Sequence, residues 1–231
     1  MVRLVLWDID HTLITMRGVG REVFGEAFRQ VTGREMQRQA RVDGMTDAVI
    51  FRETAKLHGL GTSREDFDRF ADALAEAHLR HAPRIRERGH ALAGAAAALS
   101  GLAALGLPQT VVTGNVRGSA EVKLRVFGLD SQIDWDLGAY GDDADERADL
   151  VRLALDRARQ PRMPDLTPSD TVLIGDTPAD VGAGLACGVR VIAVATGRSD
   201  AHELRAAGAQ TVLPDLADTE ALIKSVDGDP K

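Results

Sequence analysis

Short runs of apolar residues alternate along the chain with segments in which apolar residues recur every three or four positions. The short runs lack the apolar–polar alternation of a half-exposed sheet, which favours strands of a parallel sheet that is covered on both faces. They predict strands at residues 3–7, 110–113, 135–140, 171–175, 189–195 and 211–213. Because helical segments separate these runs, the pattern predicts an α/β fold with a Rossmann-like, doubly wound parallel sheet.

Stop signals for helices follow three of the segments between the predicted strands. Residues 91–105 and 117–127 are each followed by a glycine, which is favoured just past the last turn of a helix. Residues 146–159 end shortly before Pro161, which lacks the amide hydrogen that a continuing helix needs. We therefore predict that these segments are helices that cover the sheet.

Residues 16–87 interrupt this alternation, because they contain no strand candidate. Apolar residues recur at helical spacing as far as Gly33, and Thr46 is placed to cap a second helix. Ser63 and Asp66 resemble a capping box that opens a third helix. The segment is therefore predicted to be a helical insertion.

This insertion, which we call the cap, leaves residues 1–15 and 88–231 as the predicted α/β catalytic core. The cap follows the first predicted strand directly. We therefore expect it to lie over the carboxyl edge of the sheet, where ligands bind in open α/β folds. In that position it would serve as a lid over the site.

Charge and cysteine content exclude some classes of partner. The 28 Lys and Arg and 35 Asp and Glu give a net charge of −7, so the chain is a poor candidate for binding nucleic acid or an anionic membrane surface. No apolar stretch approaches the ~20 residues of a spanning helix, and the first residues lack the pattern of a signal peptide. Cys187 is the single cysteine, which fits a reducing compartment. These features predict a cytoplasmic protein.

Acidic residues stand directly after two of the predicted strands. Asp8 ends the first strand, and Asp10 lies two residues further on. Asp176 and Asp180 follow the strand at 171–175. If these strands are neighbours, their acids meet at one edge of the sheet, where close carboxylates need shared protons or a cation to coexist. Carboxylates, backbone carbonyls and water are ligands that suit Mg²⁺, which also takes a substrate phosphate.

Each of these features has an ordinary explanation when it is taken alone. An Asp-x-Asp pair often caps a loop, and Asp176 could cap a helix that begins near Pro178. The combination of acids at two strand ends, with Thr113 at the end of a third, favours a functional cluster instead. The Thr113 hydroxyl and the backbone amides after it, made accessible by Gly114, form a candidate phosphate cradle near a helix N-terminus.

The cation that would hold the phosphate is less evident, and Lys123 and Arg147 are the candidates. Lys123 lies well inside the helix that starts near Arg117, and we expect that helix to carry it away from the strand ends. Arg147 stands at the start of a later helix and is expected close to the same edge, although it could instead pair with the acids beside it in the sequence. We therefore favour Arg147.

Three motifs make the sequence similar to the haloacid dehalogenase (HAD) superfamily: "DIDHT" (8–12), "TGN" (113–115) and "GDTPAD" (175–180). Their order and spacing match from end to end, and the cap resembles the α-helical cap of phosphoglycolate phosphatase-like members. The resemblance implies a magnesium-dependent phosphoric monoester hydrolase. Its substrate would be a small phosphorylated metabolite, such as phosphoglycolate or a sugar phosphate.

The resemblance also implies roles for individual residues. Asp8 would be the nucleophile that forms an aspartyl-phosphate, and Asp10 would protonate the leaving alcohol and then activate water. Mg²⁺ would be held by the Asp8 carboxylate, the Asp10 backbone carbonyl and Asp176, with Asp180 in support. Thr113 and Asn115 would bind the phosphoryl oxygens, and the positions of Gly114 and Arg147 add these two residues to the predicted phosphate site.

Two departures from the pattern of the superfamily affect these roles. His11 stands where a glycine is usual, and we interpret it as packing against the hinge of the cap rather than lining the cleft. The usual lysine, commonly followed by proline, is not evident, so Arg147 is predicted to replace it. Asp10 favours a phosphatase over a dehalogenase, because a leaving halide needs no acid whereas a leaving alcohol benefits from one.

The sequence leaves alternative functions open. A sugar-phosphate mutase of the same superfamily would use the same nucleophile and would differ in cap residues. A non-catalytic, phospho-accepting receiver module also gathers acids at strand ends, but it is much shorter and carries its acid on an internal strand. Gly44, Met45 and Thr46 lie on a cap loop that is expected to face the cleft and to contribute to substrate choice, although Thr46 also suits a helix cap.

Overall fold

A parallel sheet forms the centre of the computed structural model, which describes residues 1–160 and 162–228. Within these residues, five strands pair in the order β4-β1-β5-β6-β7. They are β1 (Leu4–Trp7), β4 (Gln109–Val111), β5 (Thr171–Gly175), β6 (Arg190–Val194) and β7 (Thr211–Leu213). All neighbouring pairs are parallel. With helices on both faces, this sheet confirms the predicted doubly wound α/β fold.

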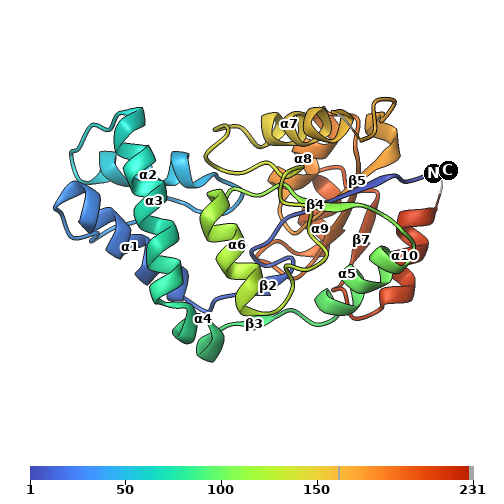
Figure 1. Cartoon of the computed structure of the whole chain (residues 1–231), viewed down its shortest axis with the longest axis horizontal. Helices are drawn as coiled ribbons and strands as arrows, with labels where there is room; N and C mark the ends of the chain where they lie inside the picture. Colours follow the sequence, from blue (N-terminus) through green and yellow to red (C-terminus); the bar gives the residue numbers. More distant parts are fainter. Residues whose placement is uncertain (161, 229–231) are drawn as a thin grey trace.

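Alternate residues of each strand face different layers of helices. Val5 and Trp7 of β1 belong to one apolar core, and Leu4 and Leu6 belong to the other. Because both faces are buried, the strands read as unbroken apolar runs in the sequence. Figure 1 shows α7 and α8 on the opposite side of the sheet from α5 and α10. The layer that packs on Val5 and Trp7 contains α5 (Ala95–Ala104), α6 (Arg117–Val126) and α10 (Thr219–Asp227). The layer that packs on Leu4 and Leu6 contains α7 (Arg147–Arg159), α8 (Pro178–Ala186) and α9 (Ala201–Ala206).

The helices of these layers end close to their predicted stop signals. Gly106 and Gly128 follow α5 and α6 with φ angles of 73° and 69°, a left-handed conformation that glycine adopts without steric cost. α7 ends at Arg159, and its predicted stop signal, Pro161, lies outside the described residues. A short 3₁₀ turn, η1 (Pro168–Asp170), precedes β5.

The prediction of a strand at 135–140 is wrong. Ala139 forms an isolated bridge with Val112, and the chain turns at Trp135. Local contacts use backbone groups that a strand would pair: the Trp135 carbonyl accepts a hydrogen bond from the Tyr140 hydroxyl at 2.5 Å, and the Tyr140 amide donates to a side chain. Leu137 and Ala139 are buried in the core that contains α7, whereas Trp135 and Tyr140 pack in the other core. Of the described residues 135–140, only Ala139 bonds to the β4 segment through its backbone, so apolar content alone was misleading here.

The cap, predicted at residues 16–87, lies between β1 and β4. Its helices are α1 (Val19–Thr32), α2 (Asp47–Leu57), α3 (Arg64–Arg80) and α4 (Ala82–Arg88). Gly33 ends α1 with a φ of 68°, and Thr46 caps α2 as expected. The predicted capping box of Ser63 and Asp66 opens α3. Figure 1 shows α1, α2 and α3 (blue to cyan) together at the end of the molecule opposite the two termini.

Two short strands that the sequence did not predict join the cap to the sheet domain. β2 (Ile14–Thr15) pairs antiparallel with β3 (His90–Ala91). β3 uses a residue that the sequence assigned to the following helix, so α5 begins only at Ala95. Strands of two residues are too short to show a period in the sequence. They lie beside the boundaries predicted for the cap, whose status as a separate domain stays a prediction.

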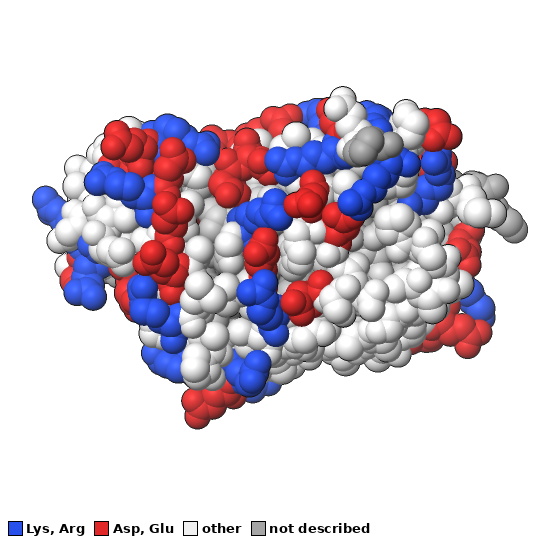
Figure 2. Space-filling model, in the orientation of Figure 1, with Lys and Arg blue, Asp and Glu red and all other residues white. Residues whose placement is uncertain are grey.

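Charged side chains of both signs are interspersed over the face of the molecule drawn in Figure 2. A largely uncharged area at the lower right of that view lies over α5, whose residues include no charged side chain. Among the described residues, no helix combines the length and the apolar character needed to cross a membrane.

We expect Phe70→Ala to lower the free energy of unfolding by about 3–5 kcal/mol, because it removes a fully buried ring from the core of the cap. The Phe70 ring stacks on Phe51 with centroids 4.4 Å apart and lies 4.8 Å from the ring of Phe24. Urea unfolding measures the change. Leu79→Ala on the exposed side of the same helix is the matched control, with an expected loss of about 0.5 kcal/mol or less. A loss below about 1 kcal/mol for Phe70→Ala would contradict the expectation.

Candidate active site

The carboxyl ends of three adjacent strands bring the predicted site residues together. β1 lies between β4 and β5, and Trp7 at the end of β1 is in register with Ile174 near the end of β5. The residues that follow these strands therefore meet at one edge of the sheet. Asp8, Thr113 and Asp176 line the same cavity, which has a volume of about 880 Å³.

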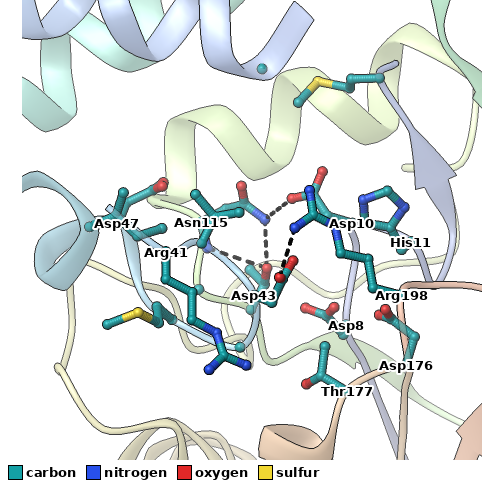
Figure 3. A pocket seen from close by; sticks show the side chains of 18 of the residues that line it. Asp8, Asp10, His11, Arg41, Asp43, Asp47, Asn115, Asp176, Thr177 and Arg198 are labelled. Carbon is teal, nitrogen blue, oxygen red and sulfur yellow. Dashed lines mark hydrogen bonds and ion pairs between the residues drawn. The ribbon is translucent and has the colours of Figure 1, made fainter. Parts of the chain in front are cut away.

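Three carboxylates approach one another closely at the base of this cavity, where Asp8 and Asp176 line it and Asp180 is fully buried behind them. Asp8, Asp176 and Asp180 are buried, and each offers an oxygen within 4.8 Å of the others. Asp176 also accepts a hydrogen bond from the Thr12 hydroxyl at 2.9 Å. The Asp10 carboxylate lies outside this group. This agrees with the sequence resemblance, which implies that Asp10 would bind the metal through its backbone carbonyl. Figure 3 shows Asp8 and Asp176 side by side beneath Asp10.

The charge of the three carboxylates is only partly balanced by the protein. Burial raises the pKa of Asp8 to about 6, although the adjacent Arg147 opposes the rise. Burial, followed by the charges of Asp8 and Asp180, raises the pKa of Asp176 to about 9. Carboxyl groups in this state require a proton or a further cation. A buried set of hard oxygen ligands fits Mg²⁺, so the residues present suit the predicted metal.

Arg147 lies between two of these acids, at the edge of the sheet where the sequence placed it. Its Nη2 is 2.6 Å from Asp8 Oδ1, and its Nε is 2.5 Å from Asp180 Oδ1. Burial acts to lower the pKa of the guanidinium, but the charges of Asp180 and Asp8 raise it above its usual value. Arg147 thus pairs with the carboxylate cluster and not with the acids beside it in the sequence. Its predicted contact with phosphate stays a prediction.

Lys123 also reaches the site, so the expectation that its helix carries it away is wrong. Its Nζ lies 2.7 Å from Asp10 Oδ2 and 2.5 Å from Asn115 Oδ1. Long side chains in a helix extend toward the N-terminus of that helix, and α6 begins immediately after the "TGN" motif. A residue inside α6 can therefore return its ammonium group to the strand ends. The spacing of residues in the sequence does not show this orientation.

A hydrogen-bond network joins Asp10 to the candidate phosphate loop. The Asn115 Nδ2 donates to Asp10 Oδ2 at 2.8 Å and to Thr113 Oγ1 at 2.7 Å. Burial acts to raise the pKa of Asp10, but Lys123 and Asn115 hold it below its usual value. The pKa of Asp8 is therefore raised and that of Asp10 is lowered. Two carboxyl groups with pKa values shifted in opposite directions can take different chemical roles.

The alternative in which Asp176 caps α8 is wrong, because Thr177 occupies the N-cap position. The Thr177 hydroxyl accepts a hydrogen bond from the Asp180 amide at 3.2 Å, and Asp180 Oδ2 accepts one from the Thr177 amide at 3.0 Å. This capping box leaves Asp180 Oδ1 for Arg147. Gly175 allows the close approach, since a Cβ there would lie 2.4 Å from the Asp180 carboxyl carbon.

His11 adopts a left-handed backbone conformation, with a φ of 64°, at the position where glycine is usual. Its amide donates to the Ile14 carbonyl at 2.7 Å, and its carbonyl accepts a hydrogen bond from the Thr196 hydroxyl at 2.5 Å. The side chain is exposed and lines the cavity. Only its backbone bonds to the hinge strand β2, so the interpretation that the side chain packs against the hinge is wrong.

The cap loop at residues 44–46 packs against both motif loops of the core. Gly44 has a φ of 71°, and a Cβ on it would lie 2.5 Å from the Ala179 Cβ in the first turn of α8. A Cβ on Gly114 would lie 2.2 Å from the Met45 carbonyl oxygen. Gly44 and Met45 line the cavity, whereas Thr46 is buried as the N-cap of α2. The loop reaches the cleft as expected, and its part in substrate choice stays a prediction.

A family model of haloacid dehalogenase-like hydrolases matches residues 5–184, which include all three motifs of the site. The chain belongs to this hydrolase family. Its membership confirms the resemblance inferred from the motifs. No curated protein sequence matches the chain.

Solved structures resemble this HAD-like hydrolase over nearly its whole length. A hydrolase from Pseudomonas syringae is 21% identical, with a TM-score of 0.71, and the match covers 99% of this chain and 100% of that one. A predicted phosphoglycolate phosphatase from Haemophilus somnus is 16% identical, with a TM-score of 0.66 and coverage of 96% and 98%. A candidate β-phosphoglucomutase from Bacteroides vulgatus is 18% identical, with a TM-score of 0.63 and coverage of 97% and 88%. At these identities the likeness establishes a shared fold.

Asp47 is a buried cap residue of this hydrolase that the sequence did not single out. Its amide donates to the Gly114 carbonyl at 2.7 Å, and its Oδ2 accepts a hydrogen bond from the Val116 amide at 2.9 Å. The cap thereby supplies the N-terminus of α6 with an acceptor, since the Val116 side chain provides none. Acidic residues are common in the first turn of a helix, because they interact favourably with the helix dipole. The position of Asp47 in α2 therefore gives no sign in the sequence of its contact with the Val116 amide.

His78 of α3 is the other residue that the sequence did not assign to the site. Its ring Nδ1 lies 2.9 Å from the Leu74 carbonyl and 3.1 Å from the Ser119 hydroxyl of α6. Burial lowers the pKa of His78 to about 3, so the ring is neutral. A neutral ring that donates from Nδ1 to the carbonyl has an acceptor at Nε2, and this buried atom has no hydrogen-bond partner among the described residues.

We expect Asp47→Asn to stabilise the protein above about pH 6. Burial raises the pKa of Asp47 from 3.8 to about 6, so the folded protein binds a proton more tightly than the unfolded chain. Stability is therefore lost as the pH rises through this interval, by up to about 3 kcal/mol at 1.36 kcal/mol per pH unit. An asparagine keeps an acceptor for Val116 and avoids this loss.

Denaturant unfolding from pH 4 to pH 8 measures the difference between Asp47→Asn and the native protein. The two curves should converge near pH 4 and separate above pH 6. Asp72→Asn, at an exposed position of α3, should follow the native curve throughout. Parallel curves for Asp47→Asn and the native protein across this range would show that Asp47 does not titrate as the structure indicates.

Proposed function

We propose that this HAD-like hydrolase is a magnesium-dependent phosphatase that acts on a small phosphorylated metabolite through an aspartyl-phosphate. The observation that carries the proposal is the placement of Asp8 beside Asp176 and Asp180 on one side and beside the Asp10–Lys123 pair on the other. The family is one of hydrolases, which favours an enzyme over a phospho-accepting binding module. The likeness in fold to a predicted phosphoglycolate phosphatase supports the same reaction.

Asp8 is the proposed nucleophile. A carboxylate is a competent nucleophile toward phosphorus, and a covalent intermediate divides the hydrolysis into two easier displacements. Asp8 follows a fully buried strand, which fixes its backbone at the base of the cavity, and Arg147 holds Oδ1. The second carboxylate oxygen, Oδ2, is then the one proposed to attack. Its bond to phosphorus forms as the bond between phosphorus and the leaving oxygen breaks.

Asp10 is the proposed acid and base. In the free protein Lys123 and Asn115 lower the pKa of Asp10 and keep it ionised. A phosphoryl group that takes over these two partners would remove the contacts that lower the pKa and would add negative charge nearby, so Asp10 would hold a proton for the leaving alcohol. After the alcohol departs, the same carboxylate would accept a proton from the water that attacks phosphorus, while the bond between phosphorus and Asp8 Oδ2 breaks and phosphate is released.

The remaining residues would bind the phosphoryl group and the metal. Asn115, Lys123 and the Thr113 hydroxyl lie together beneath the cap loop and offer hydrogen bonds to phosphoryl oxygens. Mg²⁺, held by Asp8, Asp176 and the Asp10 backbone carbonyl with Asp180 in support, would neutralise the repulsion between a carboxylate nucleophile and an anionic phosphate. The amide of Gly114 would complete the cradle.

Phosphate release from a panel of phosphorylated metabolites, including phosphoglycolate and sugar phosphates, tests the proposal. We expect release that depends on Mg²⁺ and that falls at least about 10³-fold in Asp8→Asn, because the nucleophile is lost. Asp72→Asn serves as the matched control and should retain full activity. Conversion of a sugar phosphate to its isomer without phosphate release would instead identify a mutase. Folded protein without turnover of any compound would refute the proposed reaction.

We expect Lys123→Met to reduce kcat/KM by about 10²–10³, because a cation at the phosphoryl oxygens is lost. The basic limb of the kcat/KM profile should also move to higher pH, because Asp10 acts first as an acid and loses the charge that lowers its pKa. Steady-state kinetics between pH 4 and pH 9 measure both effects. Lys56→Met, at an exposed position of α2, should change neither quantity. A kcat/KM within about threefold of the native value, with an unmoved basic limb, would leave Arg147 as the single cation proposed to bind the phosphoryl group.

A further inference from the structure

Three arginines on the cap side of the cavity carry charge that the protein does not neutralise. Arg17, Arg21 and Arg41 all line the cavity. None of them forms an ion pair with an acid in the described part of the chain. Most other arginines do so, as Arg84 and Arg88 do with Glu22. The unpaired arginines are exposed, and they converge on the space in front of the candidate active site.

The acids that line the outer part of the cavity are already engaged. Asp43 pairs with Arg198 at 3.1 Å, and Glu203 accepts a hydrogen bond from the Asp200 amide. Asp47 is buried deeper, where it accepts a hydrogen bond from the Val116 amide. Figure 3 shows the ion pair between Arg198 and Asp43, while no dashed line reaches Arg41. The positive charge of the cap side is therefore available to a ligand.

The three arginines belong to two cap segments that contact each other. Arg17 and Arg21 flank the start of α1, where Gly18 occupies the N-cap position and provides no side-chain cap. Arg21 Nη1 lies 3.4 Å from Gln39 Oε1, in the segment that carries Arg41. The positive end of the α1 dipole adds to the charge of the arginines. The cap therefore presents positive charge opposite the carboxylates of the core.

We propose that Arg17, Arg21 and Arg41 bind a second anionic group on the alcohol part of the substrate. The substrate class is then a phosphomonoester whose leaving alcohol also carries a carboxylate or a phosphate. This inference rests on the proposed function, because it requires the phosphoryl group to lie at Asp8. Guanidinium groups bind both kinds of anion through paired hydrogen bonds, and a cavity of about 880 Å³ has room for both ends of such a molecule.

Matched phosphomonoesters provide the first test. Phosphoglycolate carries a carboxylate, a sugar bisphosphate carries a second phosphate, and glycerol phosphate carries no second anion. We expect the native protein to hydrolyse one of the first two with a kcat/KM at least about tenfold higher than that for glycerol phosphate. The preferred ester identifies the anion as a carboxylate or a phosphate. Equal kcat/KM values for all three would overturn the inference.

Variants of the cap arginines provide the second test. Arg21→Ala and Arg41→Ala should each lower the ratio of kcat/KM for the anion-bearing ester to that for glycerol phosphate by about threefold to tenfold, mainly through KM. Arg21→Lys keeps the charge and should retain part of the preference. Arg34→Ala, at an exposed cap position outside the cavity, should leave the ratio unchanged. An unchanged ratio in both alanine variants would overturn the inference.

Calorimetric titration of phosphoglycolate or the bisphosphate into Asp8→Asn separates this inference from the proposed function, because that variant should bind the ester without consuming it. Weaker binding when Arg21→Ala or Arg41→Ala is added would support the anion site even if no ester were hydrolysed by the native protein. Magnesium-dependent hydrolysis of all esters at equal efficiency, with binding insensitive to these arginines, would support the phosphatase and refute the anion site.

Discussion

Burying Asp8, Asp176 and Asp180 with their oxygens within 4.8 Å of one another is energetically costly, because like charges repel strongly where water is excluded. The surrounding structure compensates for this repulsion. Arg147 contacts two of the carboxylates, Thr12 donates to the third, and the capping box of α8 fixes Asp180. The raised pKa values of Asp8 and Asp176 reflect burial and repulsion that the protein does not fully compensate, and a divalent cation is a partner that would compensate them.

The parallel sheet makes this arrangement possible without long loops. β1 and β5 are neighbours and end at the same edge, so residues that are far apart in the sequence become adjacent as soon as the strands pair. Asp10, only two residues beyond Asp8, enters a different environment because it turns toward Lys123 and Asn115. Its pKa is lowered while that of Asp8 is raised. One short motif thus provides two carboxyl groups with different chemical properties.

The cap completes the cavity that the sheet begins. Asp47 bonds to the loop after β4, and the chain at Gly44 packs onto the first turn of α8. These contacts join the cap to both loops that surround the carboxylates. The cap also differs from the core in the charge it presents, since arginines of α1 and of the loop before α2 face a cavity with an acidic floor. The proposed selection of the leaving group by the cap and the proposed chemistry of the core rest on this difference in charge.

The sequence alone determined the strand ends and the chemistry placed on them, because apolar runs and the acids that follow them are local patterns. Asp8, Asp176 and Thr113 could be assigned to one edge once a parallel sheet was predicted. The local capping box of Ser63 predicted the start of α3. Tertiary structure decided what depends on the relative orientation of elements. Lys123 reaches Asp10 because of how α6 is directed, and the 135–140 segment turns because side chains take its backbone groups. β2 and β3 are too short to carry a period and form only when two distant segments meet, so no local pattern could reveal them.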